Sequence, residues 1–131
     1  MTVFVDTNVF VANLTDEPER GKVETELLNR DFDVQTSLPN LMELRTVLTK
    51  KKQIEKDEVR STIEDIEDRV DPVFHDTSDL LAANRIQQDE LLYPMDCLIL
   101  ARDQNARLVT FDTELIDAGA STPETILSEE A

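Results

Sequence analysis

The chain has 131 residues, enough for one domain with a core of its own and too few for two ordinary domains. Acidic residues outnumber basic ones by 29 to 13, so the formal net charge is -16 at pH 7. In dilute buffer this charge excludes a general polyanion binder, because a uniformly acidic surface repels phosphate groups. We therefore expect a single domain, residues 1–131, whose last residues fray.

The acidic excess also has a second interpretation. The hydrophobic fraction is 40% and the aromatic fraction 5%, so the acids are spread over a normal globular interior. This composition resembles that of proteins from halophiles, and we expect a halophilic archaeon as the source; an acidic protein from a mesophile is the alternative. In molar salt the screening length falls to roughly 3 Å, so the repulsion becomes short-ranged. A nucleic-acid substrate is then compatible with the charge.

Cysteine content and hydropathy bear on the compartment. Cys97 is the only cysteine, which excludes an intramolecular disulfide and favours a reducing compartment. It lies in the apolar run C-L-I-L-A, so we expect a buried, inert thiol. The chain shows no signal-peptide pattern at its start and no apolar run near the roughly 20 residues that span a bilayer. These features predict a cytoplasmic protein that does not enter a membrane.

The chain opens with a strand pattern and then a helical one. Residues 2–5 are mainly β-branched or aromatic and predict a buried strand. Because residues 9–14 look helical, the sheet should be parallel. A second helix is expected from Pro18, since proline suits the first helical turn.

A second strand and two longer helices follow. Residues 32–36 form the strand candidate, and Ser37 with Pro39 opens a helix. Residues 56–70 predict an amphipathic surface helix that Asp71-Pro72 ends. The two apolar stripes consist of Leu41, Leu44 and Leu48 in the first of these helices, and Val59, Ile63 and Ile66 in the second.

The second half of the chain repeats the alternation of strand and helix. Val73 and Phe74 predict a brief third strand, and Ser78 is expected to cap the next helix. A helix beginning near Pro94 is apolar on most sides, so we expect it to be central. The remaining elements are a fourth strand at 108–110, a helical turn at 112–118 and a last edge strand at 125–127.

This alternation predicts a three-layer α/β/α sandwich around a central parallel sheet. In such sheets, sites form beyond the carboxyl ends of the strands. Asp6 and Asp112 follow the first and fourth strands at that edge. Glu43 lies in the first or second turn of the helix after the second strand, and Asp96 in the first turn of the helix near Pro94. All four carboxylates could therefore meet.

Each of these four acids also has an ordinary structural explanation. Asp6 and Asp112 can cap the helices that follow them. Asp96 gains from the helix dipole without any further role. Glu43 lies roughly 130° from the centre of its helix's apolar stripe, which permits a solvated position.

The combination of the four acids points further. Asp96 is the only charge between Glu90 and Arg102, and its apolar neighbours make an unpaired carboxylate costly. Several carboxylates at one edge repel one another unless a cation lies between them. Oxygen ligands without a cysteine or histidine cluster favour Mg²⁺ or Mn²⁺ over zinc. His75, the only histidine, is expected to lie in a loop or at a strand end without a ligand role.

The same segments resemble a known family. The chain contains V-F-V-D-T-N-V-F-V, L-M-E-L-R-T-V-L, P-M-D-C-L-I-L-A-R-D and L-V-T-F-D-T-E-L, which resemble the motifs of PIN-domain ribonucleases. The short length is similar to that of the VapC toxins of toxin-antitoxin pairs. The resemblance covers nearly the whole chain, and its motifs are specific only jointly.

The resemblance implies a metal-dependent endoribonuclease. Its catalytic and metal-binding acids would be Asp6, Glu43, Asp96 and Asp112, holding one or two Mg²⁺ or Mn²⁺ ions. The ions would activate a water and stabilise the phosphodiester displacement. Asn8 and Thr110 match residues that orient this site. Asp103 would support the metal through water, or serve only the surface.

The resemblance also implies partners. The RNA substrate, tRNA or ribosomal RNA, would contact the densest basic cluster of the chain, although a solvated helix end explains that cluster equally well. A homodimer and a separately encoded antitoxin are also implied. PIN domains serve in RNA maturation and decay too, so the toxin role is one of two. The basic cluster consists of Arg45, Lys50, Lys51 and Lys52.

Three other classes compete with this interpretation. A haloacid-dehalogenase-like phosphatase needs an aspartate two residues after Asp6, where this chain has Asn8. A receiver domain needs paired acids after its first strand, and they are missing. A non-catalytic PIN-like scaffold that binds RNA or protein remains open, although it would have no reason to retain four mutually repelling acids.

Overall fold

A computed structural model describes residues 1–15, 20–30, 32–101 and 106–130. The strands in this part of the chain form one parallel sheet in the order β3-β2-β1-β4. Phe4 in the central strand pairs with Gln35 on one side and with Leu108 on the other. The parallel sheet is therefore confirmed. Its strands are β1 (Thr2–Val5), β2 (Asp33–Ser37), β3 (Asp71–Val73) and β4 (Arg107–Val109).

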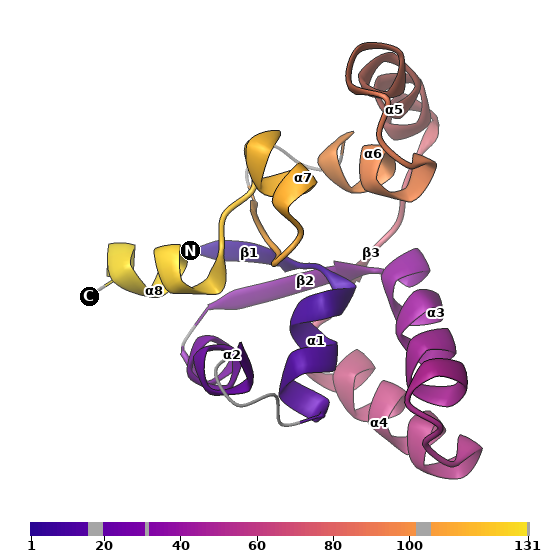
Figure 1. Ribbon diagram of the computed structural model, residues 1–131, viewed down its shortest axis with the longest axis vertical. Helices are drawn as coiled ribbons and strands as arrows, with labels where there is room; N and C mark the ends of the chain where they lie inside the picture. Colours follow the sequence, from indigo (N-terminus) through magenta and orange to yellow (C-terminus); the bar gives the residue numbers. More distant parts are fainter. Residues whose placement is uncertain (16–19, 31, 102–105, 131) are drawn as a thin grey trace.

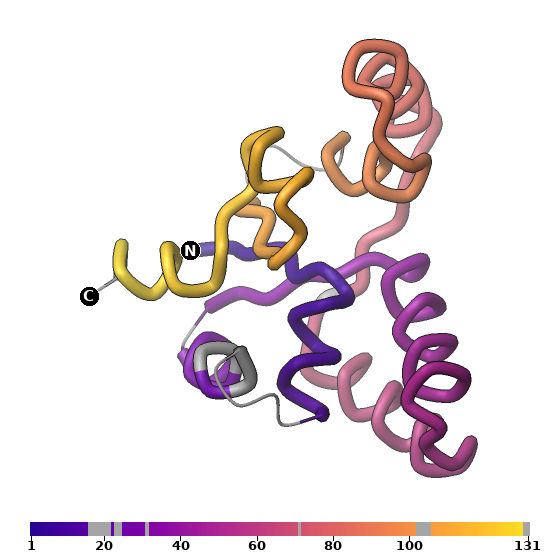
Figure 2. The backbone as a smooth tube through the Cα atoms, viewed as in Figure 1, coloured from indigo at the N-terminus to yellow at the C-terminus, as the bar shows by residue number. Residues whose placement is uncertain are grey.

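Helices cover both faces of this sheet, so the predicted three-layer α/β/α sandwich is confirmed. Figure 1 shows α1 to α4 on one side of the sheet and α5, α6 and α7 on the other. Figure 2 shows the start of β1 and the end of α8 on the same side of the molecule. The helices are α1 (Thr7–Leu14), α2 (Arg20–Asn29), α3 (Leu38–Thr46), the π-helical turn η1 (Val47–Lys51), α4 (Lys56–Arg69), α5 (Thr77–Glu90), α6 (Pro94–Ala101), α7 (Thr113–Asp117) and α8 (Pro123–Glu130).

The main core lies between the sheet and the helices α1, α3 and α4. Val3 and Val5 of β1 are fully buried, as expected for a central strand covered on both faces. Both predicted apolar stripes are confirmed, because every one of their six residues is buried in this core. The core thereby fixes α3 beside the end of β1. Its stripe residues are Leu41, Leu44, Leu48, Val59, Ile63 and Ile66.

The prediction of an edge strand at residues 125–127 is wrong. These residues lie in α8, where Ile126 is fully buried in the main core. The Thr122 hydroxyl accepts a hydrogen bond from the Thr125 backbone N–H at 3.1 Å, which is the geometry of a helix cap. Pro123 occupies the first helical position, where its missing N–H costs nothing.

Two details around β3 differ from the prediction. The strand spans Asp71–Val73, so it includes Pro72 and leaves out Phe74. Proline is tolerated because β3 is an edge strand. The cap of α5 is Asp76 rather than Ser78, because the Asp76 carboxylate accepts from the Asp79 N–H at 2.9 Å in a reciprocal capping box.

Helix α6 is not central, contrary to the prediction. Its buried residues Cys97 and Ile99 are not part of the main core, and Cys97 joins Ala83 of α5 and Leu92 in a separate small cluster. Figure 1 shows α5 and α6 packed together at one end of the molecule. Cys97 is nevertheless buried, as predicted, and burial raises the pKa of its thiol.

The remaining expectations concern Pro18 and Asp103, membrane-spanning helices, and His75. The start of the second helix at Pro18 and the position of Asp103 lie outside the described residues. Within the described part, each helix is either too short or too polar to cross a lipid bilayer. His75 lies between β3 and α5 with its Nδ1 3.8 Å from Asp79 Oδ2, and it does not line the pocket that holds the predicted acids.

Candidate active site

Asp6 lies directly after β1, and hydrogen bonds hold its carboxylate in place. The side chain is 6% exposed. Oδ1 accepts from the Thr7 backbone N–H at 2.8 Å and from Asn40 Nδ2 at 3.1 Å. Oδ2 accepts from the Thr110 hydroxyl at 2.8 Å. Since an ionised carboxylate offers about four acceptor positions, these three donors leave room for one further partner.

Thr110 and Asn8 connect β4 to the start of α1. Thr110 is fully buried, and its hydroxyl accepts from the Asp112 N–H at 3.0 Å while donating to Asp6. Asn8 donates from Nδ2 to the Thr110 hydroxyl at 3.1 Å and accepts the Phe111 N–H at 3.2 Å. This network fixes the loop that carries Asp112 relative to Asp6. The two residues predicted to orient the acids thus lie beside them.

The four predicted acids line one open pocket of about 520 Å³ at the carboxyl ends of β1 and β4. We call it the acidic pocket. Asp6 and Asp112 precede α1 and α7, while Glu43 comes from α3 and Asp96 from the first turn of α6. Asp6 is buried, Asp96 and Asp112 are half-buried, and Glu43 is exposed. Residues 6, 43, 96 and 112 are far apart in sequence, so the fold brings them together.

The acids influence one another electrostatically. Burial, followed by the charges of Asp112, Asp6 and Glu43, raises the pKa of Asp96 to about 6. Burial also raises the pKa of Asp6, and Glu43 adds to the rise, although the hydrogen bonds from Thr110, Thr7 and Asn40 oppose it. Negative charge is therefore concentrated here beyond what the local hydrogen bonds compensate.

The donor chemistry of the acidic pocket fits a hard divalent cation. All four predicted ligands are carboxylates, and in the described part of the chain neither Glu43 nor Asp96 has an ion pair or a hydrogen-bond donor. Oxygen-only ligands suit Mg²⁺ or Mn²⁺. Among the described residues, no three acidic, histidine or cysteine side chains stand close enough to hold one ion together. Binding therefore requires the exposed side chains, Glu43 above all, to turn toward Asp6.

The ordinary explanations for two of the acids also hold. Asp6 is the N-cap of α1, and Asp112 is the N-cap of α7 through the Glu114 N–H at 2.9 Å. Capping uses one oxygen of each carboxylate, because Thr7 binds Asp6 Oδ1 and Glu114 binds Asp112 Oδ1. Capping and ion binding are therefore compatible at both positions.

The sequence did not identify several residues of this site. Asn40 is 1% exposed and contacts Asp6, and Ser37 Oγ caps α3 by accepting the Asn40 N–H at 3.1 Å. Glu114 adds to the charge at Asp96. Tyr93 lines the pocket and is 76% exposed. The sequence S-L-P-N at residues 37–40 could have indicated Asn40, because it places a second polar side chain three residues after the Ser37 helix cap.

The structure divides the predicted basic cluster. Lys51 and Lys52 line the acidic pocket. Arg45 and Lys50 instead line a different pocket, between α3, η1 and α4. The change of side follows from helical geometry, because residues 43, 47 and 51 share one face of the α3–η1 helix while 46 and 50 share the next.

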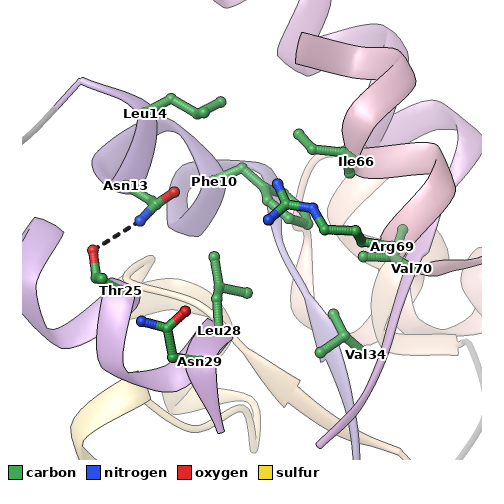
Figure 3. A pocket seen from close by; sticks show the side chains of 10 residues that line it. All are labelled: Phe10, Asn13, Leu14, Thr25, Leu28, Asn29, Val34, Ile66, Arg69 and Val70. Atoms are coloured by element: carbon green, nitrogen blue, oxygen red, sulfur yellow. Dashed lines mark hydrogen bonds between the residues drawn. The ribbon is translucent and has the colours of Figure 1, made fainter. Parts of the chain in front are cut away.

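A third pocket, of about 120 Å³, lies at the amino ends of the strands, away from the acids. Figure 3 shows its walls, formed by Phe10, Leu28 and Val34 with the Arg69 side chain beside them. Asn13 of α1 donates to the Thr25 hydroxyl of α2 at 2.9 Å across one side. None of the predicted site residues lines this pocket.

The fold and the acidic pocket define a class of protein: a three-layer α/β domain with carboxylates from four elements at the carboxyl edge of a parallel sheet. Within this class, residues 3–120 match one family, the PIN domain. This protein belongs to the PIN domain family. No curated protein sequence matches the chain.

Solved structures share the fold at low sequence identity. The toxin VapC20 of Mycobacterium tuberculosis, described as cleaving the sarcin-ricin loop, is 21% identical with a TM-score of 0.74, over 91% of this chain and 96% of that one. The protein PAE2754 of Pyrobaculum aerophilum is 17% identical with a TM-score of 0.72, over 98% and 88%. A toxin-antitoxin complex from Klebsiella pneumoniae is 20% identical with a TM-score of 0.70, over 92% and 97%.

Proposed function

We propose that this protein is an Mg²⁺- or Mn²⁺-dependent endoribonuclease that hydrolyses RNA phosphodiester bonds in its acidic pocket. The observation that carries the proposal is the convergence of Asp6, Glu43, Asp96 and Asp112, with the pKa of Asp96 raised to about 6 by burial and its acidic neighbours. Membership of the PIN domain family supports a nuclease. The likeness to VapC20 and to a toxin-antitoxin complex favours a toxin over an RNA maturation or decay enzyme.

The residues of the chain divide the work. The four acids hold one or two ions, and bound divalent ions supply an activated water and neutralise charge on the phosphate. Asn40 and Thr110 keep the Asp6 carboxylate in one orientation, so that it meets an ion without rearranging. Lys51 and Lys52 at the rim attract the phosphates of the RNA.

The decisive test is cleavage of tRNA and ribosomal RNA in molar KCl with Mg²⁺, Mn²⁺ or EDTA, comparing the parent protein with Asp6→Asn. Asparagine caps a helix as well as aspartate does, so the bond from the Thr7 N–H and the start of α1 should be retained. We expect metal-dependent cleavage that falls by about 100-fold or more in this variant, because an ion ligand is lost. Asp89→Asn, an exposed change of the same charge on α5, is the control and should cleave normally.

If the Asp6→Asn variant retains both cleavage and metal binding, the assignment of the site is contradicted. A parent protein that binds RNA but does not cut it, whichever ion is added, would instead support the non-catalytic scaffold. Circular dichroism of both variants separates these outcomes from misfolding.

We further propose two protein partners, a second copy of this chain and an antitoxin, acting in the cytoplasm. Large apolar side chains are exposed at the start of α5 and just before it: Phe74 at 66%, Leu80 at 55% and Leu81 at 58%. A surface of this kind favours a protein contact. Sedimentation equilibrium of the parent and of Leu81→Glu tests the dimer, which the charge should weaken; identical masses at monomer size would contradict it.

A further inference from the structure

The pocket beside η1 has an unusual composition. It has a volume of about 370 Å³ and lies between α3, η1 and the first turns of α4. Val59, which is 2% exposed, forms its apolar base. We call it the basic pocket. Its polar lining consists of Arg45, Thr46, Thr49, Lys50, Lys56 and Arg60.

The charge of the basic pocket is opposite to that of the protein. Acids outnumber bases by 29 to 13 in the chain, yet among the described residues four cationic side chains and no acid line this pocket. Arg60 reaches Asp57 only at 3.9 Å, with both side chains largely exposed, so that ion pair contributes little. In the described part of the chain Arg45, Lys50 and Lys56 form no ion pair. Four like charges around one hollow are stabilised by an anion.

The chemistry of the lining selects a phosphate group. The cations and two threonine hydroxyls are donors for phosphate oxygens. As far as the structure describes the chain, the lining includes no aromatic side chain on which a base could stack, and Val59 is its one apolar residue. The pocket therefore suits a sugar-phosphate backbone without reading its bases.

The basic pocket and the acidic pocket lie on two faces of the same helix. Glu43, Val47 and Lys51 line the acidic pocket, while Thr46 and Lys50 line the basic one. An α-helix with its side chains is about 10–12 Å across. One strand whose backbone follows the surface of this helix can therefore contact both pockets, with phosphates that are several nucleotides apart.

We propose that the basic pocket is a second phosphate-binding site, which holds the RNA backbone several nucleotides from the bond that is cut. This inference rests on the proposed function. Lys51 and Lys52 of the acidic pocket directly follow Lys50 of the basic pocket in the chain. The basic pocket extends the contact with RNA to Lys56 and Arg60 of α4.

The test is RNA binding by Lys56→Gln/Arg60→Gln in the non-cleaving Asp6→Asn background. The control is Lys22→Gln/Arg85→Gln in the same background, which removes equal charge from exposed positions on α2 and α5. Fluorescence anisotropy with a labelled single strand of about eight nucleotides is followed from about 0.1 M to 1 M KCl. Circular dichroism at each salt concentration checks the fold.

We expect the Lys56→Gln/Arg60→Gln variant to bind about tenfold more weakly at the lowest salt. The negative slope of log K against log [KCl] should become shallower by about 1.4, or about 0.7 for each lost phosphate contact on a single strand. Equal binding of the strand by this variant and the control would overturn the proposal.

Other outcomes separate this inference from the proposed function. If the parent cleaves RNA but Lys56→Gln/Arg60→Gln, the α4 variant, binds RNA as the control does, only the second site is overturned. RNA binding that depends on Lys56 and Arg60 in a parent that never cleaves supports the second site and contradicts the nuclease. If RNA binding is unaffected but a Glu-rich peptide or inorganic phosphate loses binding in the α4 variant, the pocket belongs to another anion and the proposal falls.

Discussion

The hydroxyl of Thr110 is the residue-scale feature on which the acidic pocket depends most. It is fully buried and takes part in hydrogen bonds with Asp6, Asn8 and the Asp112 N–H. A buried hydroxyl in such a network contributes to stability mainly because its partners would otherwise be unsatisfied. Thr110 therefore links the position of two acids to the stability of the domain.

Thr110→Val should lower the free energy of unfolding by about 1–3 kcal/mol, because it leaves Asp6 Oδ2 and the Asp112 N–H without this partner. Cleavage should fall by about tenfold or more beyond any loss of folded protein. Urea denaturation and the rate per folded molecule measure the two effects. Thr62→Val, which removes a hydroxyl bonded to the Glu58 carbonyl away from both pockets, is the control and should be nearly neutral.

The pKa of Asp96 predicts a pH dependence for the metal-free protein. Burial and its acidic neighbours raise this pKa to about 6 from 3.8, so the folded state binds more protons than the unfolded state in that window. The free energy of unfolding should therefore fall as the pH rises from about 4 through about 6. The raised pKa of Asp6 acts in the same direction.

Asp96→Asn should remove the part of this loss that Asp96 causes, by up to about 1 kcal/mol because the half-exposed carboxyl is screened by water. Thermal unfolding in EDTA at pH 5 and pH 7 (about one unit either side of the pKa) measures it in both proteins. If stability changes equally with pH in the parent and in Asp96→Asn, the charge of Asp96 does not destabilise the folded state. Divalent ions should bind more tightly at the higher pH, because Asp96 must lose its proton first.

At the scale of secondary-structure elements, α8 shows how a short segment was misassigned. T-I-L is compatible with a strand by composition, and three residues are too few to show a helical period. The cap at Thr122 and the burial of Ile126 against the core decide for a helix. By contrast, the stripe that runs through α3 and η1 and the stripe of α4 were long enough to identify helix and buried face together.

The helix cap of α8 makes a selective prediction. Thr122→Ala should destabilise the protein by about 1 kcal/mol, because the Thr125 N–H loses its acceptor. Thr122→Asn should retain most of the stability, since asparagine caps a helix at least as well as threonine. Urea denaturation of the three proteins is the measurement, and equal losses in both variants would contradict the cap.

At the scale of the whole molecule, the net charge of -16 should make stability depend on salt. Raising KCl from about 0.1 M to about 1 M shortens the screening length from about 10 Å to about 3 Å, which weakens the repulsion among surface acids. We expect the free energy of unfolding to rise by about 1 kcal/mol or more, or roughly 4 °C in Tm. Differential scanning calorimetry measures it. A Tm that is flat or falls with KCl would contradict the expected halophilic source.

The sequence by itself determined the layers, the parallel sheet and the chain positions of the four acids. It could do so because strand and helix periods are local properties, and because polar residues that follow parallel strands lie at one edge. Asp6, Glu43, Asp96 and Asp112 therefore appeared as candidates before any contact was known.

Only the tertiary structure decided which side chains share a pocket. It separated Lys51 and Lys52 from Arg45 and Lys50, and it placed α6 against α5 instead of at the centre. It also added Tyr93 to the lining of the acidic pocket and Asn40 as a buried hydrogen-bond partner of Asp6. These relations depend on how one helix face is rotated against its neighbours, and a rotation of 100° per residue moves adjacent basic residues to different surfaces. That rotation is fixed by core packing between segments far apart in the chain, which no local pattern records.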